Sequence, residues 1–536
     1  MDKYDLIVLG SGPAGQRGAI QAAKLGRTVL LIEQTFQIGG ACLHSGTIPS
    51  KTLREAVLYL SGWRQRGFYG RSYRVKERIT AADLMQRLEV TIRHEIEVLQ
   101  HKLHRNHVTV VAGRASFAGP NQIRIETDED TFKVVEGEKI LIATGSRPVK
   151  PANIPFDGVH VVDSDEILQM QDLPRNIVVV GAGVIGVEYA SILSALDMHV
   201  TLIDGREDIL SFIDREIVGE FVHHLRDRGV SILLGETVES VESIDAQNVR
   251  IHLNSGRKIR ANMVLFASGR VSNTDRLSLD KAGLQPDDRG RLKVDGYYRT
   301  EVPHIYAAGD VVGFPALAST SAEQGRRAAS HAFNGPMLKA EDNVFPYGIY
   351  AVPEMSVIGK SEEELKAAKI PYESGIARFR ETSRGQILGL REGLLKLLFH
   401  IDTHKLLGAH IVGEGATELI HIGQAVLALE GTLDFFVNAT FNYPTLAEAY
   451  KIAALDAFNK IESDARPKLL ITADRHLLNQ NRAGAHAARQ LTIIADRDDA
   501  AKHIAQVARD CDFFNWVGEV SMLNPKAARA ARVIGG

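Results

Sequence analysis

The apolar positions of the chain form short runs of strand length, separated by glycine turns and amphipathic segments. Residues 4–9 make one such run, which ends at a glycine turn, and residues 28–32 make the next. From residue 83 to residue 103 the apolar positions recur at helical spacing, which predicts a long amphipathic helix. Further strands are expected around residues 108–117, 122–125 and 139–144. This alternation is typical of a parallel sheet covered by helices.

The same order of elements begins again at residue 177. A strand, the glycines Gly181, Gly183 and Gly186, a helix and a strand at 200–203 follow one another. The two openings, LIVLGSGPAG and VVVGAGVIG, are similar, so we interpret them as two copies of one nucleotide-binding module. A strand at 263–267 closes the second copy, and the chain then returns to the first sheet with residues 300–310 as its last strand. The expected fold class is α/β, with two Rossmann-like domains.

The pattern changes after residue 344, where strands and amphipathic helices continue without a glycine fingerprint. We therefore expect an α+β interface domain at residues 345–461. The first nucleotide-binding domain is predicted to comprise residues 1–150 and 273–344, and the second to comprise residues 151–272. Residues 462–536 form an extension with two strand-like pieces, at 469–475 and 491–497, and no motif that indicates its role.

Composition narrows the classes of function. The 536 residues carry 63 basic and 66 acidic side chains, and a net charge of −3 gives no electrostatic reason to bind nucleic acid or an anionic membrane. Only two cysteines are present, Cys42 and Cys511, and the N-terminus has no signal-peptide layout, so we expect a cytoplasmic protein. The apolar stretch 177–196 is about long enough to cross a bilayer, but Glu188 and the glycine turn within it favour a buried strand and helix. The 19 histidines form no metal-ligand pattern, so no metal is expected.

The first glycine turn predicts a dinucleotide site. In Gly10-Ser11-Gly12-Pro13-Ala14-Gly15, the first glycine makes a tight turn, the second admits a pyrophosphate and the third lets helix and strand pack closely. The helix that follows offers free N–H groups to the phosphates. Glu33 closes the next strand, where an acid can accept hydrogen bonds from a ribose.

The second module predicts a second dinucleotide site. Asp204 ends its second strand, where NAD enzymes place an acid that binds the ribose 2′-hydroxyl. Arg206 follows two residues later and could bind a 2′-phosphate. The combination favours acceptance of both NAD and NADP, although Arg206 as a solvated turn residue stays an alternative. Two dinucleotides in one chain indicate electron transfer between them, which is the plan of a flavoprotein reductase.

Residues 39–51, GGACLHSGTIPSK, resemble the active-site helix of the pyridine nucleotide-disulfide oxidoreductases, in which two cysteines five positions apart form a redox disulfide beside the flavin. The resemblance extends over about residues 1–461. It implies FAD in the first module, a nicotinamide dinucleotide in the second, and a homodimer or larger homo-oligomer. Lys51 and Glu188 correspond to the family's ion pair beneath the flavin, and Cys42 lies in the same environment. The implied FAD-binding residues are Gly10, Gly12, Gly15, Glu33, Gly40, Cys42, Lys51, Thr144, Gly145, Asp310 and Ala318. The implied NAD(P)-binding residues are Gly181, Gly183, Gly186, Glu188, Asp204, Arg206, Gly269 and Arg270.

Two departures from the family pattern are informative. Thr47 stands where the family has its second cysteine, and Tyr443, in FNYPTLAE, stands where it has a histidine that serves the thiols. The dithiol and its acid–base partner are thus missing together, which points to a reaction that needs neither. Both replacements match the soluble pyridine nucleotide transhydrogenases, a branch of this family. The resemblance implies an NAD(P)+ transhydrogenase of the Si-specific type, which passes hydride reversibly from NADPH to NAD+ through FAD and so balances the two coenzyme pools.

Other functions stay in competition at this point. Thr47 and Tyr443 count against a dihydrolipoamide dehydrogenase. An NAD(P)H:quinone or oxygen reductase would use the same reduced flavin, and the sequence is compatible with it as a side activity. A non-catalytic sensor is disfavoured because both nucleotide sites look intact.

Overall fold

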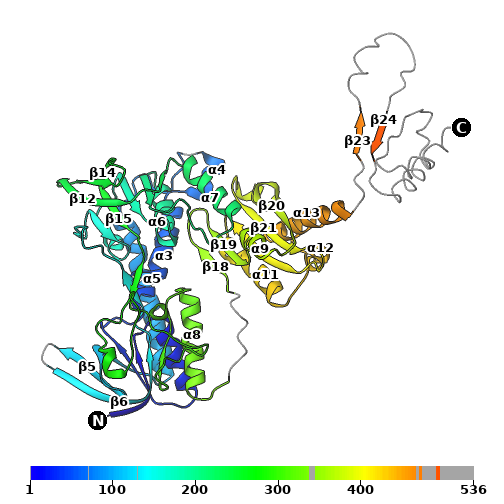
Figure 1. Cartoon of the computed structure of the whole chain (residues 1–536). Coiled ribbons are helices and arrows are strands. Elements are labelled where there is room, and N and C mark those ends of the chain that lie inside the picture. Colours follow the sequence, from blue (N-terminus) through cyan, green and yellow to red (C-terminus); the bar gives the residue numbers. More distant parts are fainter. Residues whose placement is uncertain are drawn as a thin grey trace, which may run out of the picture.

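The computed structural model describes residues 2–70, 72–128, 131–336, 345–465, 470–473 and 491–494. Three larger sheets, of seven, five and five strands, organise this part of the chain. Figure 1 shows the first sheet with the N-terminus at the bottom, the second above it, and the third, in yellow, beside the second. The first sheet is largely parallel with two antiparallel pairs at one side, the second is entirely parallel and the third is antiparallel, which confirms the expected α/β fold class.

The first sheet is built around the apolar strand β1 (Asp2–Leu9), whose second half is buried. Its strands run in the order β3-β2-β1-β6-β5-β4, and β17 also pairs with β6. The remaining strands are β2 (Val29–Glu33), β3 (Thr109–Ala112), β4 (Arg114–Gly119), β5 (Gln122–Asp128), β6 (Thr131–Ile142) and β17 (Ile305–Ala307). The pairs β1–β2, β1–β6, β2–β3 and β17–β6 are parallel, so their carboxyl ends meet at one edge.

Helices α1 (Pro13–Lys24) and α8 (Ala318–Ala332) pack against each other beside this sheet. A Cβ at Gly325 would lie 2.0 Å from the carbonyl oxygen of Ala14, so glycine is what lets the two helices touch. The long helix α5 (Ala81–Arg105) agrees with its prediction to within two residues at each end. Its start is set by a capping box, in which Thr80 and Asp83 each bind the other's backbone N–H.

Two strand predictions were wrong in their extent. The run at 108–117 is split at Gly113 into β3 and β4, because β3 continues the parallel sheet while β4 pairs with the antiparallel strand β5. A Cβ at Gly113 would lie 2.7 Å from Cγ2 of Ile125, so the corner needs a glycine. Of residues 300–310 only β17 is a strand. Thr300 and Val302 form a turn in which the N–H of Ile305 donates to the carbonyl of Val302 at 2.9 Å.

The second sheet is entirely parallel in the order β11-β10-β9-β15-β8. Its strands are β8 (Val161–Asp163), β9 (Asn176–Val180), β10 (His199–Asp204), β11 (Ser231–Leu234) and β15 (Met263–Phe266). Helix α6 (Val184–Ser194) has nine buried residues, so the apolar stretch 177–196 is the buried strand β9, its turn and α6. Within the described residues no helix is both long and apolar enough to cross a membrane. The small antiparallel sheet β12 (Val238–Asp245), β13 (Asn248–Leu253) and β14 (Lys258–Ala261) lies next to this unit.

The third sheet is antiparallel in the order β18-β19-β22-β21-β20. Its strands are β18 (Tyr347–Ile349), β19 (Met355–Gly359), β20 (Tyr372–Arg378), β21 (Leu394–His400) and β22 (Leu406–Val412). Helices α11 (Ala416–Ala428) and α13 (Glu448–Ala465) pack on it. A Cβ at Gly375 would lie 1.8 Å from the carbonyl oxygen of Ala453, which shows how closely α13 approaches β20.

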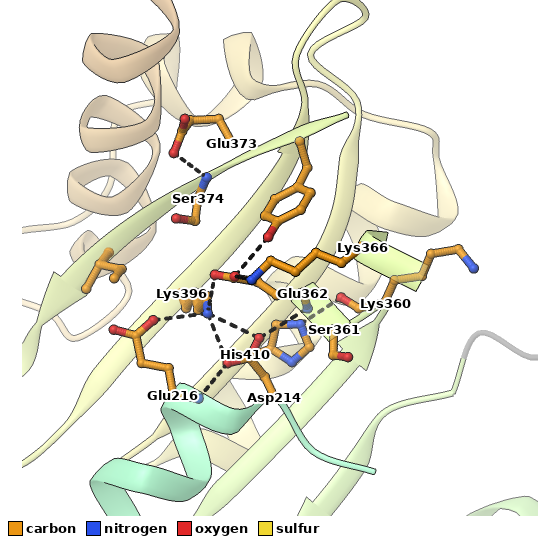
Figure 2. Close-up of polar contacts among 12 residues, drawn as sticks. Asp214, Glu216, Lys360, Ser361, Glu362, Lys366, Glu373, Ser374, Lys396 and His410 are labelled. Carbon is orange, nitrogen blue, oxygen red and sulfur yellow. Dashed lines mark hydrogen bonds and ion pairs between the residues drawn. The ribbon is translucent and has the colours of Figure 1, made fainter. Parts of the chain in front are cut away.

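A buried cluster of charges ties the second sheet's helix α7 (Arg215–Asp227) to the third sheet (Figure 2). Lys396 of β21, only 2% exposed, lies 3.0 Å from Asp214, 3.0 Å from Glu216 and 2.7 Å from Glu362, which begins α9 (Glu362–Ala368). Although burial by itself would raise it, hydrogen bonds from Lys366, Lys396 and Tyr372 lower the pKa of Glu362 to about 2. The cluster therefore holds two units of the chain together through the ion pairs of Lys396.

Beyond α13 only two short strands are described. β23 (Leu470–Ala473) and β24 (Leu491–Ile494) form an antiparallel pair, as the two strand-like pieces of the extension suggested. The first four residues of the extension, 462–465, belong to α13, whereas Cys511 and the rest of the extension, apart from these two strands, lie outside the described residues.

Candidate active site

One cavity of about 2340 Å³ opens where the first two sheets meet. It is lined by the turns after β1, β2 and β6 of the first sheet and by the turns after β9, β10 and β11 of the second. Ligands of open parallel sheets bind at these carboxyl ends. A site for one small molecule typically measures ~300–1,000 Å³, so this cavity has room for more than one dinucleotide.

The first glycine turn has the geometry of a phosphate cradle. Gly10 has φ of 102°, and a Cβ there would lie 2.4 Å from the carbonyl oxygen of Ala143. A Cβ at Gly15 would lie 1.8 Å from the carbonyl oxygen of Gly10, so α1 could not start so close to β1 with any other residue. A Cβ at Gly12, by contrast, would meet nothing within 4 Å, and this residue lines the cavity. The N-terminus of α1 is thus open to an anionic ligand.

Glu33 ends β2 with its side chain buried at the cavity wall. Its Oε2 accepts hydrogen bonds from the backbone N–H of Ser11 at 3.0 Å and from the Ser11 hydroxyl at 2.6 Å, and its Oε1 accepts from the N–H of Gln34 at 2.8 Å. A carboxylate has about four acceptor positions, so one is left for a ribose hydroxyl.

The segments after β6 and β17 complete this half of the cavity. The hydroxyl of Thr144 is buried without a hydrogen-bond partner, and Gly145 next to it has φ of 68°. Asp310 accepts a hydrogen bond from the Ser146 hydroxyl at 2.6 Å, and Ala318 begins α8 at the cavity wall. The orphaned hydroxyl, the cradle and the acid fit a bound dinucleotide such as FAD, which supplies both phosphates and ribose hydroxyls.

Lys51 and Glu188 meet across the boundary of the two modules. The Nζ of Lys51, on α3 (Thr47–Leu60), lies 2.7 Å and 3.0 Å from the two carboxylate oxygens of Glu188, on α6. Glu188 is only 5% exposed, and the backbone N–H of Tyr350 donates to it at 2.8 Å. The same ammonium lies 4.9 Å from the centre of the Tyr350 ring, where a cation–π interaction adds to the ion pair. Sequence reasoning missed Tyr350, because no motif marks it.

The second glycine turn repeats the geometry of the first. Gly181 has φ of 108°, and a Cβ there would lie 2.5 Å from the carbonyl oxygen of Ala267. A Cβ at Gly186 would lie 1.7 Å from the carbonyl oxygen of Gly181, whereas one at Gly183 would meet nothing. The two turns therefore offer two phosphate cradles to one cavity.

Asp204 and Arg206 lie together at the end of β10, but they bind each other. Oδ1 of Asp204 accepts from the backbone N of Arg206 at 2.8 Å and from its Nε at 2.9 Å, and Oδ2 accepts from Nη2 of Arg206 at 2.7 Å and from the N of Ala182 at 2.5 Å. Burial by itself would raise the pKa of Asp204, yet these contacts hold it below its usual value. All four acceptor positions are occupied, so Arg206 must move before Asp204 can accept from a ribose.

Arg270 connects the two modules at the back of the cavity. Its guanidinium donates to the hydroxyl of Ser146 at 2.9 Å and to the carbonyl of Ser146 at 2.8 Å, and it pairs with Asp165 at 3.2 Å. Gly269, with φ of 110°, makes the turn that precedes it. Tyr189 of α6 lines the cavity with a buried hydroxyl that has no partner, another group that no motif indicated.

Residues 4–325 match the family described as "Pyridine nucleotide-disulphide oxidoreductase", and residues 345–454 match its dimerisation domain. The chain belongs to the pyridine nucleotide-disulphide oxidoreductase family. FAD and pyridine nucleotides are the cofactors of this family.

The chain aligns with nearly the whole length of several members of the family. A protein of Mycobacterium tuberculosis strain ATCC 25177 / H37Ra, named soluble pyridine nucleotide transhydrogenase, is 50% identical over 464 residues, 86% of this chain and 99% of its own. One of the same name from Klebsiella pneumoniae is 43% identical over 461 residues, 85% of this chain and 98% of its own. The crystal structure of LpdA from Mycobacterium tuberculosis superposes with a TM-score of 0.78 at 24% identity, covering 85% of this chain and 99% of that one. The flavoprotein disulfide reductase RclA of Escherichia coli superposes with a TM-score of 0.75 at 26% identity, covering 84% and 99%.

This oxidoreductase differs from the family's disulfide pattern at Cys42. Cys42 lies on the short helix α2 (Gly40–His44) at the cavity wall, and Gly40 begins that helix. Among the described residues Cys42 is the only cysteine, and it is free. Burial raises the pKa of its thiol, although a hydrogen bond with Thr47 counteracts the shift. A protonated thiol without a second sulfur beside it is a poor nucleophile.

The second departure, Tyr443, lies on the surface of the oxidoreductase's third unit. Its side chain is 69% exposed, and its hydroxyl contacts the hydroxyl of Ser383. It does not line the cavity of its own chain.

Proposed function

We propose that this oxidoreductase is an FAD-dependent NAD(P)+ transhydrogenase, which moves hydride reversibly between NADPH and NAD+ without a redox disulfide. The observation that carries the proposal is the pairing of two dinucleotide cradles in one cavity with Cys42 at its wall, which in the described part of the chain has no second cysteine beside it. A disulfide reductase needs two sulfurs there. Hydride exchange between nicotinamides needs only orientation and electrostatics.

The first cradle would hold FAD. Gly10, Gly12 and Gly15 would receive its pyrophosphate, and Glu33 would accept from a ribose hydroxyl through its remaining acceptor position. Thr144, Gly145, Asp310 and Ala318 would bind its other half, where the orphaned Thr144 hydroxyl would find a partner. When bound, FAD supplies a group that accepts hydride from one nicotinamide and returns it to another.

The chain's own residues would orient and polarise this site. Glu188 and the Tyr350 ring hold the Lys51 ammonium in place, so a positive charge stays at the cavity wall. A fixed charge that needs no reorganisation stabilises negative charge that develops during a reaction. Cys42 would contribute packing rather than a covalent step.

The second cradle would take NAD and NADP in turn. Gly181, Gly183 and Gly186 would hold the pyrophosphate, with Gly269 and Arg270 at the junction of the modules. Arg206 would leave Asp204 in both cases: for NAD, so that Asp204 can accept from the 2′-hydroxyl, and for NADP, so that its guanidinium can bind the 2′-phosphate. The two relatives named soluble pyridine nucleotide transhydrogenase support this assignment.

The proposal extends to the protein's self-association, its compartment and its physiological role. The match of residues 345–454 to a dimerisation domain supports self-association, with Tyr443 at the boundary between subunits. The two cysteines favour a reducing compartment, the cytoplasm, where the reaction would balance NADPH against NADH. The domain boundaries at residues 150, 272, 344 and 461 stay a prediction.

A steady-state assay tests the proposal directly. Purified FAD-loaded protein is mixed with NADPH and thio-NAD+, whose reduction is followed by absorbance, and parallel reactions offer lipoamide or a quinone in place of thio-NAD+. We expect thio-NAD+ to be the fastest acceptor and lipoamide to be inert. Turnover with lipoamide, or turnover with quinone that exceeds that with thio-NAD+, would contradict the proposal.

A further inference from the structure

Glu236, in the turn after β11, has a buried carboxylate oxygen with no hydrogen-bond partner, and the residue lines the cavity. A buried acceptor without a donor is rare in a folded protein, because leaving it unsatisfied costs free energy. A ligand in the cavity that donates a hydrogen bond would satisfy this oxygen.

Backbone hydrogen bonds hold Glu236 beside the turn of Asp204 and Arg206. Its N–H donates to the carbonyl of Asp204 at 3.1 Å, and the N–H of Gly235 donates to the carbonyl of Arg206 at 3.1 Å. On its other side, Thr237 accepts from and donates to Asn254 at 3.0 Å and 2.8 Å. The side chain is thus presented by a fixed loop, next to the carboxylate that would bind the ribose.

The order of the strands says which part of the coenzyme reaches this loop. β9, β10 and β11 are neighbours in that order, ~4.8 Å apart. The pyrophosphate cradle follows β9 and the ribose acid Asp204 ends β10, so a coenzyme that continues in the same direction places its adenine over the end of β11. Glu236 is the acid at that end.

The first module runs the same way but ends differently. Its cradle follows β1, Glu33 ends β2, and β3 is followed by Gly113 and the first residues of β4, Arg114 and Ala115, all of which line the cavity. No carboxylate stands at the third position there, so an acid at Glu236 is a property of the second site.

We propose that Glu236 recognises the exocyclic amino group of the coenzyme's adenine, and that it determines specificity for the base in both NAD and NADP. A carboxylate only accepts hydrogen bonds, and this amino group offers two donors. Hypoxanthine carries a carbonyl at the same place, which would face the carboxylate as a second acceptor. The inference rests on the proposed function only in that the second module binds a nicotinamide dinucleotide.

Binding measurements with base analogues test it. FAD-loaded protein is titrated by calorimetry with NAD+ and NADP+ and with their hypoxanthine analogues. We expect the wild type to prefer adenine by about ten- to a hundredfold, the range of a hydrogen bond to a charged group. In Glu236→Gln the ratio should fall toward one for both coenzymes, because an amide can accept from the amino group or donate to the carbonyl. Glu236→Ala should lose the ratio as well, and an unchanged FAD spectrum confirms that each variant is folded.

Glu239→Gln is the matched control, since Glu239 is exposed on β12 and does not line the cavity. This variant should keep the wild-type ratio. A wild-type ratio near one, or a ratio that Glu236→Gln leaves unchanged, would overturn the proposal. The proposal would also be overturned if Glu236→Gln changed only the relative affinity for NAD and NADP and left the preference for adenine unchanged. That result would mean that Glu236 binds the displaced Arg206. Binding ratios need no turnover, so failure of the transhydrogenase assay would refute the proposed function and leave this result standing.

Discussion

Arg206→Ala should separate the two coenzymes in a calculable way. In the structure Arg206 is 56% exposed and its partner Asp204 only 7%, and an ion pair with one exposed member contributes ~0–1 kcal/mol. A charge-assisted contact of the guanidinium with a 2′-phosphate contributes ~1.5–3 kcal/mol. NADP+ binding requires exchanging the first contact for the second. Arg206→Ala should therefore weaken NADP+ binding by about 0.5–3 kcal/mol, or about two- to 150-fold in Kd.

NAD+ should respond in the opposite direction. Without the Arg206 side chain two of the four acceptor positions of Asp204 are already free, so NAD+ no longer has to displace the guanidinium. Its Kd should fall, by at most about fivefold for ~1 kcal/mol. Calorimetric titration of FAD-loaded protein with each coenzyme measures both changes, and Arg226→Ala, which removes an exposed arginine of α7, controls for net charge. If Arg206→Ala weakened both coenzymes by one common factor, this turn would not read the 2′ position.

Four further variants test other parts of the structure. Cys42→Ser should retain FAD and transhydrogenase turnover within a few-fold, and a loss of about a thousandfold with FAD still bound would restore a covalent role for the thiol. Lys396→Met should lower the free energy of unfolding in urea by ~3–5 kcal/mol, because it leaves the buried carboxylate of Asp214 and the partly buried one of Glu362 without their cation. Lys366→Met removes the 63%-exposed lysine that also pairs with Glu362, so the free energy of unfolding should fall by less than ~1 kcal/mol. Equal losses in the two variants would refute the argument from burial. Tyr443→Phe should keep turnover within a few-fold and lose no limb of the pH–rate profile, and an inactive variant with intact FAD would make the tyrosine catalytic.

Local patterns in the sequence were sufficient to place most elements. Apolar runs located β1, β2, β9 and β10 to within about two residues at each end, and helical periodicity found α5 because its capping box and its apolar stripe agree. The same patterns failed at Gly113, where the pairing partner changes from β2 to β5, and at residues 300–304, where a local turn interrupts the strand. A strand is defined by its partner, so its ends are poorly determined by local sequence.

The two glycine turns were also readable from the sequence, since a Cβ at Gly15 or Gly186 collides with the preceding turn of the same module. Lys51 and Glu188 could be named by resemblance, but their separation of 2.7 Å across 137 positions is a product of how two modules dock. The pairing of Asp204 with Arg206 is local, but only the structure shows that it occupies acceptor positions of Asp204. A motif specifies which groups are present, and the fold specifies which of them are already occupied.

The sequence by itself determined the fold class, the two cradles and the absence of a second cysteine near Cys42, because each depends on residues close together along the chain. Only the tertiary structure decided that the ion cluster at Lys396 joins two units, and that Tyr350 lies over the Lys51 ammonium. It alone revealed the unpartnered carboxylate of Glu236 at the end of β11. These features depend on burial and on contacts between segments more than a hundred residues apart, or on what surrounds a single atom, and neither leaves a pattern in the sequence.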